Sequence, residues 1–171
     1  MRRERGASLS GLMFTLTLAA ILTTLAAPVF SNLAANTRLQ TGTERLYTAI
    51  WFARSEAIMR ARSVVIAARD EDWEAGWEIF VDANGDGRRQ AEETLLRQSP
   101  GAPERVSIHA NAGIGTAVHY QADGRTRRPS GSLQMGTVTL CHGGSVSRAR
   151  GGRGIVINTA GRPRITRDPA C

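Results

Sequence analysis

One stretch of the sequence has residue types at a spacing that could bind a metal ion. It fits the expression for an EF-hand loop, with Asp82, Asn84, Asp86, Gly87 and Glu93 at the required positions. Such a loop gives Ca²⁺ oxygen ligands at alternate positions, a glycine at the bend and a bidentate acid at the end. The flanking residues, however, are typical of strands, and two arginines inside the loop would repel a cation. A polar hairpin turn with no metal is therefore the alternative interpretation.

A second stretch, Gly161–Arg164, could bind phosphate groups. Gly161 permits a turn, and Pro163 fixes its own φ and favours an extended Arg162. In an extended strand, residues two apart share a face at a separation of ~6.6 Å. The guanidinium groups of Arg162 and Arg164 could therefore hold successive phosphates of one nucleic-acid strand. The alternative is a solvated hairpin that only ends a sheet.

The basic charge of the chain is concentrated toward its C-terminus. The net charge is +7 and every basic side chain is an arginine. From residue 125 onward there are nine arginines and one aspartate, so this part carries +8 and the first 124 residues carry −1. A GC-rich genome explains the missing lysine but not this clustering, which predicts an anionic partner for the C-terminal third of the chain. The residues expected to extend the field around the arginine pair are Arg148, Arg150, Arg153 and Arg167.

The remaining reactive residue types do not form a catalytic pattern. The three histidines have no spacing typical of metal ligands, and His119, between Val118 and Tyr120, is expected on the solvent side of a strand. We therefore expect no enzyme activity and no cofactor. Cys141 and Cys171 would form a disulfide in an exported chain and close a loop worth ~3–4 kcal/mol. In a cytosolic chain they would be free thiols.

A long apolar segment begins close to the start of the sequence. Residues 6–37 are 32 positions without a charge, and they follow a short basic stretch. One interpretation is a signal peptide cleaved near Ala26-Ala27, although Pro28 is disfavoured directly after a cut. A second is a membrane anchor, for which ~20 apolar residues suffice.

The helix of this segment is expected to continue beyond the apolar residues. Apolar side chains recur at steps of 7, 4, 3 and 4 residues, which places them on one face of a helix. These positions are Leu39, Leu46, Ile50, Ala53 and Ala57. The charged residues of the stretch, including Glu56, lie off this stripe. The pattern predicts a helix from Leu9 to Arg60 with a kink at Pro28.

After residue 62 the pattern changes to short strands separated by turns, among them Asp123-Gly124 and Ala160-Gly161. The predicted strands are Val64–Ala68, Trp77–Val81, Thr94–Arg97, Val106–Ala110, Ala117–Tyr120, Thr137–Cys141, Ile155–Asn158 and Arg164–Thr166. The glycine- and arginine-rich stretch 143–154 is expected to be a loop. The predicted fold class is α+β, with one long helix packed on an antiparallel sheet.

The start of the chain resembles the leader of a type IV prepilin. In that family a short basic leader ends in a glycine, here Gly6, and a prepilin peptidase cuts after it and methylates the new first residue, here Ala7. Pro28 then occupies the twenty-second mature position, where the family commonly has proline. The family's glutamate at the fifth mature position is replaced by Gly11, which favours a minor or tip subunit over a subunit of the filament body.

The head resembles the GspH/FimT group of minor pilins and pseudopilins. The resemblance lies in the stretches 53–58, 76–87, 140–141, 155–158 and 161–164. It implies a type IV pilin fold with a leader at 1–6, a transmembrane helix at 7–35, an amphipathic continuation at 36–62 and a periplasmic β-rich head at 63–171. The implied partners are other pilins, the prepilin peptidase and the inner membrane.

Three functions follow from this resemblance and the motifs. The first is a minor pilin near the tip of a type IV pilus. In the FimT branch, a Gly-Arg-x-Arg motif that Arg162 and Arg164 match is implicated in binding DNA during natural transformation. The second is a structural pseudopilin of type II secretion, and the third is a secreted calcium-binding protein.

Overall fold

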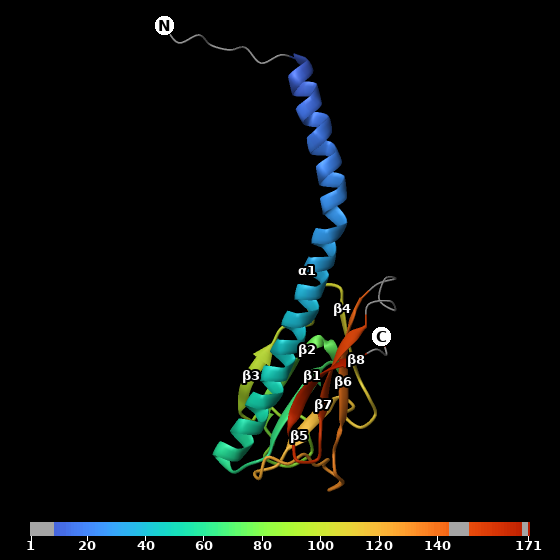
Figure 1. Cartoon of the computed structure of the whole chain (residues 1–171). Coiled ribbons are helices and arrows are strands. Elements are labelled where there is room, and N and C mark those ends of the chain that lie inside the picture. The colour runs from blue at the N-terminus through green and yellow to red at the C-terminus, as the bar shows by residue number, and fades with distance from the viewer. Residues whose placement is uncertain (1–8, 144–150, 169–170) are drawn as a thin grey trace. The chain divides into compact units, whose positions relative to one another are not determined.

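The computed structural model describes residues 9–143, 151–168 and 171, except for the side chains of residues 23, 25–29 and 168. The chain divides into two units, Met1–Asn36 and Thr37–Cys171, and helix α1 (Leu9–Arg60) contributes to both (Figure 1). The predicted helix from Leu9 to Arg60 is thus confirmed. The predicted processing residues Gly6 and Ala7 lie outside the described residues, and the kink at Pro28 stays a prediction.

The helix of the first unit has an apolar, exposed surface. Leu9 and Phe14 are 75% and 71% exposed. The hydroxyl groups of Thr15 and Thr24 donate hydrogen bonds of 2.8 Å to carbonyl oxygens three residues earlier. These bonds satisfy the threonine side chains within the helix itself. Within the described residues, no helix is both long and apolar enough to span a bilayer.

In the second unit, the apolar stripe of α1 faces the core as predicted. All five of its members, from Leu39 to Ala57, are at most 5% exposed. Glu56, expected off the stripe, is nevertheless buried. Its carboxylate accepts a hydrogen bond of 2.6 Å from Nε of Arg60, and this ion pair one turn along the helix explains the burial.

The helix ends where the chain takes a left-handed turn at Ala61, which has a φ of 51°. The amide of Arg62 donates to the carbonyl of Ala57, and the amide of Ala61 donates to that of Ile58. These bonds satisfy the last carbonyl groups in the manner of a Schellman motif. They also direct the chain into the first strand of the head.

All eight predicted strands are present, but they form two antiparallel sheets rather than one (Figure 1). One sheet has the order β3-β2-β1-β5 and the other the order β4-β6-β7-β8. Pairing partners are set by long-range contacts that strand periodicity does not reveal. The strands are β1 (Val64–Arg69), β2 (Asp72–Val81), β3 (Leu95–Ser99), β4 (Val106–Ala110), β5 (Ala117–Tyr120), β6 (Gly136–His142), β7 (Gly152–Ile157) and β8 (Pro163–Asp168).

A shared hydrophobic core joins the helix to both sheets. It combines the α1 stripe with buried residues of each sheet, such as Trp77 and Ile79 of β2 and Leu140 and Ile155 of β6 and β7. The residues Gly152–Gly154, expected in a loop, belong to β7 instead. The core holds the strands in place. The two candidate binding motifs lie at the ends of strands, one in the loop after β2 and the other in the turn between β7 and β8.

Candidate functional site

The arginine motif begins in a tight turn after β7. The amide of Gly161 donates to the carbonyl of Asn158 at 2.8 Å, and the amide of Arg162 donates to Oδ1 of the same asparagine at 3.0 Å. Gly161 has a φ of 72°, which favours glycine. The predicted turn at Ala160-Gly161 is confirmed, and it fixes the backbone from which Arg162 projects.

A second turn, at residues 121–125, supports the first. The position that a Cβ atom of Gly161 would take lies 2.0 Å from the carbonyl oxygen of Gly124, so the two backbones are in close contact. The hydroxyl of buried Tyr120 donates to the carbonyl of Gly161 at 3.2 Å. Burial raises the pKa of Tyr120 above its usual value, which keeps this donor protonated.

Helix α1 holds the supporting turn in place through Arg54. Its Nε donates to the carbonyl of Gly124 at 3.1 Å, and its guanidinium carbon lies 5.4 Å from the centroid of the Trp51 ring. The helix therefore positions Gly124, and Gly124 in turn limits where Gly161 can lie. The sequence shows the two glycine turns but not that they touch.

The two arginines of the motif lie at the edge of the second sheet. Pro163 is the first residue of β8, the edge strand, where its missing N–H costs no hydrogen bond between strands. Arg162 and Arg164 are both exposed, on either side of buried Pro163. Binding of phosphate groups by this pair stays a prediction.

Two of the other predicted arginines lie on the opposite side of the sheet from this pair. Arg153 and Arg167 are directly opposite each other in the pairing of β7 with β8. Their positions along the strands differ from that of Arg164 by an odd number of residues, so their side chains lie on the opposite side of the sheet from Arg164. Arg148 and Arg150 lie outside the described residues. The four described arginines of the expected field are therefore divided between the two sides of the sheet.

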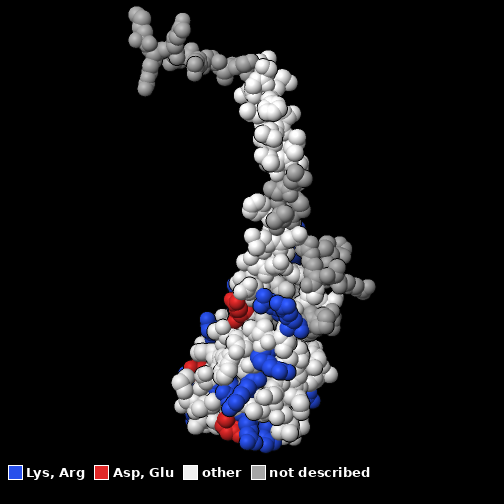
Figure 2. Space-filling view, in the orientation of Figure 1, with Lys and Arg blue, Asp and Glu red and all other residues white. Residues whose placement is uncertain are grey.

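Arg162 and Arg164, the two exposed arginines of the motif, have no acidic partner among the described side chains. The ion pairs of the described residues involve Arg60, Arg89, Arg105 and Arg125. Figure 2 shows basic side chains spread over the visible face of the head, with few acidic groups between them. Arg162 and Arg164 are therefore able to attract an anion without first breaking an ion pair among the described residues.

Arg125 is a neighbour of the motif that the sequence did not single out. It follows Gly124 in the supporting turn, and it precedes Thr126, whose amide donates to the carbonyl of Thr159. Arg125 is exposed, and its Nε lies 3.7 Å from the carboxylate of Asp123. No local signal in the sequence indicates that residue 125 lies beside residues 159–161.

The acidic loop uses its own carboxylates to hold its backbone. Asp82 accepts the amides of Gly85 and Gly87, at 2.8 and 3.1 Å. Glu93 accepts the amides of Ala83 and Gln90, at 2.8 and 3.0 Å. Among the described residues, no group of three or more histidine, cysteine, aspartate or glutamate side chains is arranged to hold a metal. The structure of the loop therefore gives the calcium interpretation no support.

Asp86 and Asn84 also form hydrogen bonds within the loop. Asp86 accepts the amide of Arg88, and this bond lowers the pKa of Asp86. Asn84 accepts the amide of Asp86 and donates to its carboxylate. Burial raises the pKa of Asp82, although the amides of Gly85 and Gly87 oppose that shift.

His119 does not face open solvent, which corrects its predicted place. The ring is half-buried, and a Cβ atom on Gly87 of the acidic loop would lie 2.2 Å from its Cε1. The loop therefore covers the side of the first sheet on which His119 lies, paired with Val65. Desolvation lowers the pKa of His119 to about 4, and the charge of Arg128 contributes to this shift.

Comparison with known proteins places this fold in a family. The family model described as Type II transport protein GspH matches residues 42–161, which is well over half of the chain. The chain belongs to the GspH family. No curated protein matches it.

Two solved structures of pilin-like proteins resemble this GspH-family chain. The type IV minor pilin FimU of Pseudomonas aeruginosa is 26% identical, with a TM-score of 0.62 over 77% of this chain and 90% of that chain. The minor pseudopilin EpsH from the type 2 secretion system of Vibrio cholerae is 11% identical and shows the shared fold alone, with a TM-score of 0.55 over 78% of this chain and 99% of that chain. The predicted type IV pilin fold is confirmed, and the chain is of the class of minor pilins and pseudopilins.

The GspH-family match ends at Gly161, directly before the arginine pair. The family assignment therefore does not depend on Arg162 and Arg164. The predicted disulfide between Cys141 and Cys171 is confirmed, with Cα atoms 5.7 Å apart. It ties the end of the chain beyond β8 back to β6 and, by restricting the unfolded chain, stabilises the folded head by ~3–4 kcal/mol.

Proposed function

We propose that this chain is a minor pilin of a type IV pilus, anchored in the inner membrane by its N-terminal helix. The observation that carries the proposal is the likeness to FimU, which is higher in identity and TM-score than the likeness to EpsH. The exposed apolar surface of the helix from Leu9 onward supports an anchor or a bundle with similar helices. Cleavage after Gly6 would leave Gly11 where pilins have a glutamate, which supports a place near the tip.

The experiment is to shear pili from the bacterial strain that encodes the chain. We expect the chain in the sheared fraction by mass spectrometry, and we expect deletion of its gene to reduce surface pili while leaving type II protein secretion unchanged. Loss of secretion with normal pili would contradict the proposal. That result would favour the alternative, a pseudopilin, for which the description of the matching family model is the supporting observation.

We further propose that the head binds double-stranded DNA through Arg162 and Arg164. The support is that both side chains are exposed, have no acidic partner among the described residues, and follow a turn held by Asn158 and Gly161. Contacts of this type are made to phosphates, so binding should depend little on sequence and should weaken as salt increases.

A matched pair of double variants tests this DNA proposal in gel shifts with the full-length chain in detergent. Arg162→Gln with Arg164→Gln should weaken binding about tenfold and reduce the slope of log affinity against log salt by about 2. Arg153→Gln with Arg167→Gln removes the same charge from the other side of the sheet and should have a smaller effect. Equal losses in both variants, or no loss in the first, would refute the role of the pair.

A further inference from the structure

A groove of about 300 Å³ lies between helix α1 and the edge of the first sheet. The helix lines it with Glu44 and Arg45, and the sheet lines it with Trp77 of β2 and with Arg97 and Ser99 of β3. Trp77 is 1% exposed and is paired with Ser99 across the two strands, so the floor is part of the packed core. The groove is therefore a fixed feature of the head and not an opening between loose segments.

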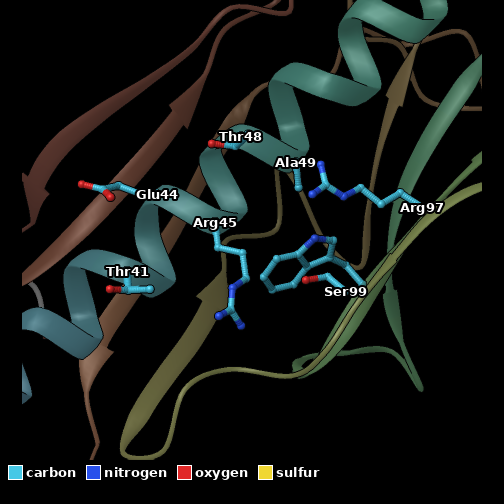
Figure 3. A pocket seen from close by; sticks show the side chains of 8 residues that line it. Thr41, Glu44, Arg45, Thr48, Ala49, Arg97 and Ser99 are labelled. Atoms are coloured by element: carbon cyan, nitrogen blue, oxygen red, sulfur yellow. The ribbon is translucent and has the colours of Figure 1, made fainter.

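Two guanidinium groups border this groove from opposite walls. Arg45 and Arg97 are both exposed, and neither pairs with an acid among the described side chains. Arg97 extends from β3 toward Ala49 of the helix, whereas Glu44 points away (Figure 3). The carboxylate of Glu44 accepts a hydrogen bond from Gln40 at 2.9 Å. The groove therefore presents two positive charges that no acid among the described side chains neutralises.

Arg97 is held in a defined position beside the groove. Its guanidinium carbon lies 5.6 Å from the centroid of the Phe52 ring, on the helix. Stacking on an aromatic ring leaves the N–H groups of a guanidinium free to form hydrogen bonds with a carboxylate.

Strand β3 also has an unpaired edge. It is the end strand of its sheet and pairs only with β2 among the described strands. The outer N–H and C=O groups of such a strand can pair with an added strand from another chain. Main-chain hydrogen bonds then supply affinity, and side-chain pockets beside the strand supply specificity.

We propose that β3 and this groove form a docking site for an extended, acidic segment of another protein chain. The segment adds a strand to the edge of β3, and a carboxylate side chain enters the groove between Arg45 and Arg97. The charges argue for an acidic segment, because the groove has two guanidinium groups without an acidic partner among the described side chains. This site is separate from the arginine pair at β8 and does not depend on binding of DNA.

The groove fits a peptide better than a nucleic acid. Trp77 is too deeply buried to stack on a base, and stacking is the usual second component of binding to single strands. An unpaired strand edge, in contrast, offers hydrogen bonds that only a peptide backbone matches in spacing.

The test is fluorescence anisotropy with the full-length chain in nonionic detergent and labelled seven-residue peptides. The probe alternates valine and glutamate, and its partner peptide alternates valine and lysine. We expect saturable binding of the glutamate peptide, weakened about tenfold by Arg45→Gln with Arg97→Gln. The matched control, Arg38→Gln with Arg105→Gln, removes the same charge at exposed positions outside the groove and should change binding less than twofold.

A third peptide separates strand addition from attraction of charge. The same glutamate peptide, N-methylated at alternate residues on one edge, keeps its charges but cannot form the main-chain hydrogen bonds. It should bind at least tenfold more weakly than the unmodified probe. Equal binding of both peptides, equal losses in both double variants, or no saturable binding would each overturn the proposal. Binding of oligothymidine that is lost in the Arg45 and Arg97 variant would also overturn it, in favour of a nucleic-acid site.

Discussion

The acidic loop after β2 and the arginine turn before β8 both match binding motifs, yet they differ in how their side chains are used. In the acidic loop, the carboxylates of Asp82 and Glu93 accept four backbone amides and hold the loop closed. In the arginine turn, backbone contacts hold the turn, and Arg162 and Arg164 remain exposed. A motif can bind an external partner only if its charged groups are not already required by the fold.

The largest expected effect comes from breaking the backbone contact that supports the arginine turn. Gly161→Ala should lower the free energy of unfolding by about 3 kcal/mol, because it combines a strained φ with a clash against the carbonyl of Gly124. Gly131→Ala is the control, since Gly131 also has a positive φ but has no heavy atom near its Cβ position. It should cost only about 1 kcal/mol. Chemical denaturation measures both, and equal losses would mean that the two turns do not support each other.

The acidic loop should be sensitive to pH through the histidine that it covers. The pKa of His119 is about 4 in the folded chain, below its ordinary 6.5, so the unfolded chain binds the extra proton between these values. Stability should therefore be fully present above pH 6.5 and decrease by up to about 3 kcal/mol as the pH falls to 4.

The His119→Gln variant isolates this pH effect. Unfolding curves of the native chain and the variant should converge as the pH falls from 6.5 to 4, because only the native chain loses the contribution of a neutral histidine. The raised pKa of Asp82 affects both proteins alike and cancels in the difference. A difference that stays constant with pH would show that the loop does not desolvate His119.

A smaller loss is expected from removing a carboxylate of the acidic loop. Asp82→Ala leaves the amides of Gly85 and Gly87 without an acceptor and should cost about 2 kcal/mol. Asp123→Ala is the control, because that carboxylate is exposed and accepts a single backbone amide. Calcium should not raise the melting temperature of the native chain. A rise of several degrees at millimolar calcium would show that the loop can exchange its amide partners for a metal.

The smallest effect is expected from the arginine pair itself. Replacing both Arg162 and Arg164 by Gln should change the free energy of unfolding by less than about 0.5 kcal/mol, since exposed side chains without partners contribute little to stability. Thermal unfolding measures this change. A loss above 1 kcal/mol would mean that these arginines serve the fold, as the acids of the other loop do.

Sequence patterns predicted those parts of the structure that depend on residues close together in the chain. The apolar stripe from Leu39 to Ala57 predicts the buried face of α1, because helical periodicity repeats within a few residues. The eight strands were also predicted, although β2 and β7 begin earlier than expected. The opposite sides taken by Arg164 and Arg167 could have been predicted as well, since an odd separation along a strand reverses the side.

The rest depends on contacts between distant residues. The division into two sheets, the contact of Gly124 with Gly161 and the cover over His119 each join segments far apart in the sequence. The same holds for the groove at β3, where Arg45 and Arg97 come from different elements. In the sequence, neither arginine differs from an ordinary surface residue. Only the fact that both line one groove indicates a site.

The measurement that tests the account most directly is the mass of the mature N-terminus in protein isolated from the bacterial membrane fraction. A pilin retains its apolar helix after processing, so the account predicts a chain that begins with N-methylated Ala7. A chain that begins near Pro28 and is recovered free in the periplasm would contradict it. In that case the head would be an ordinary secreted protein, and neither a pilus nor its tip would be its place of action.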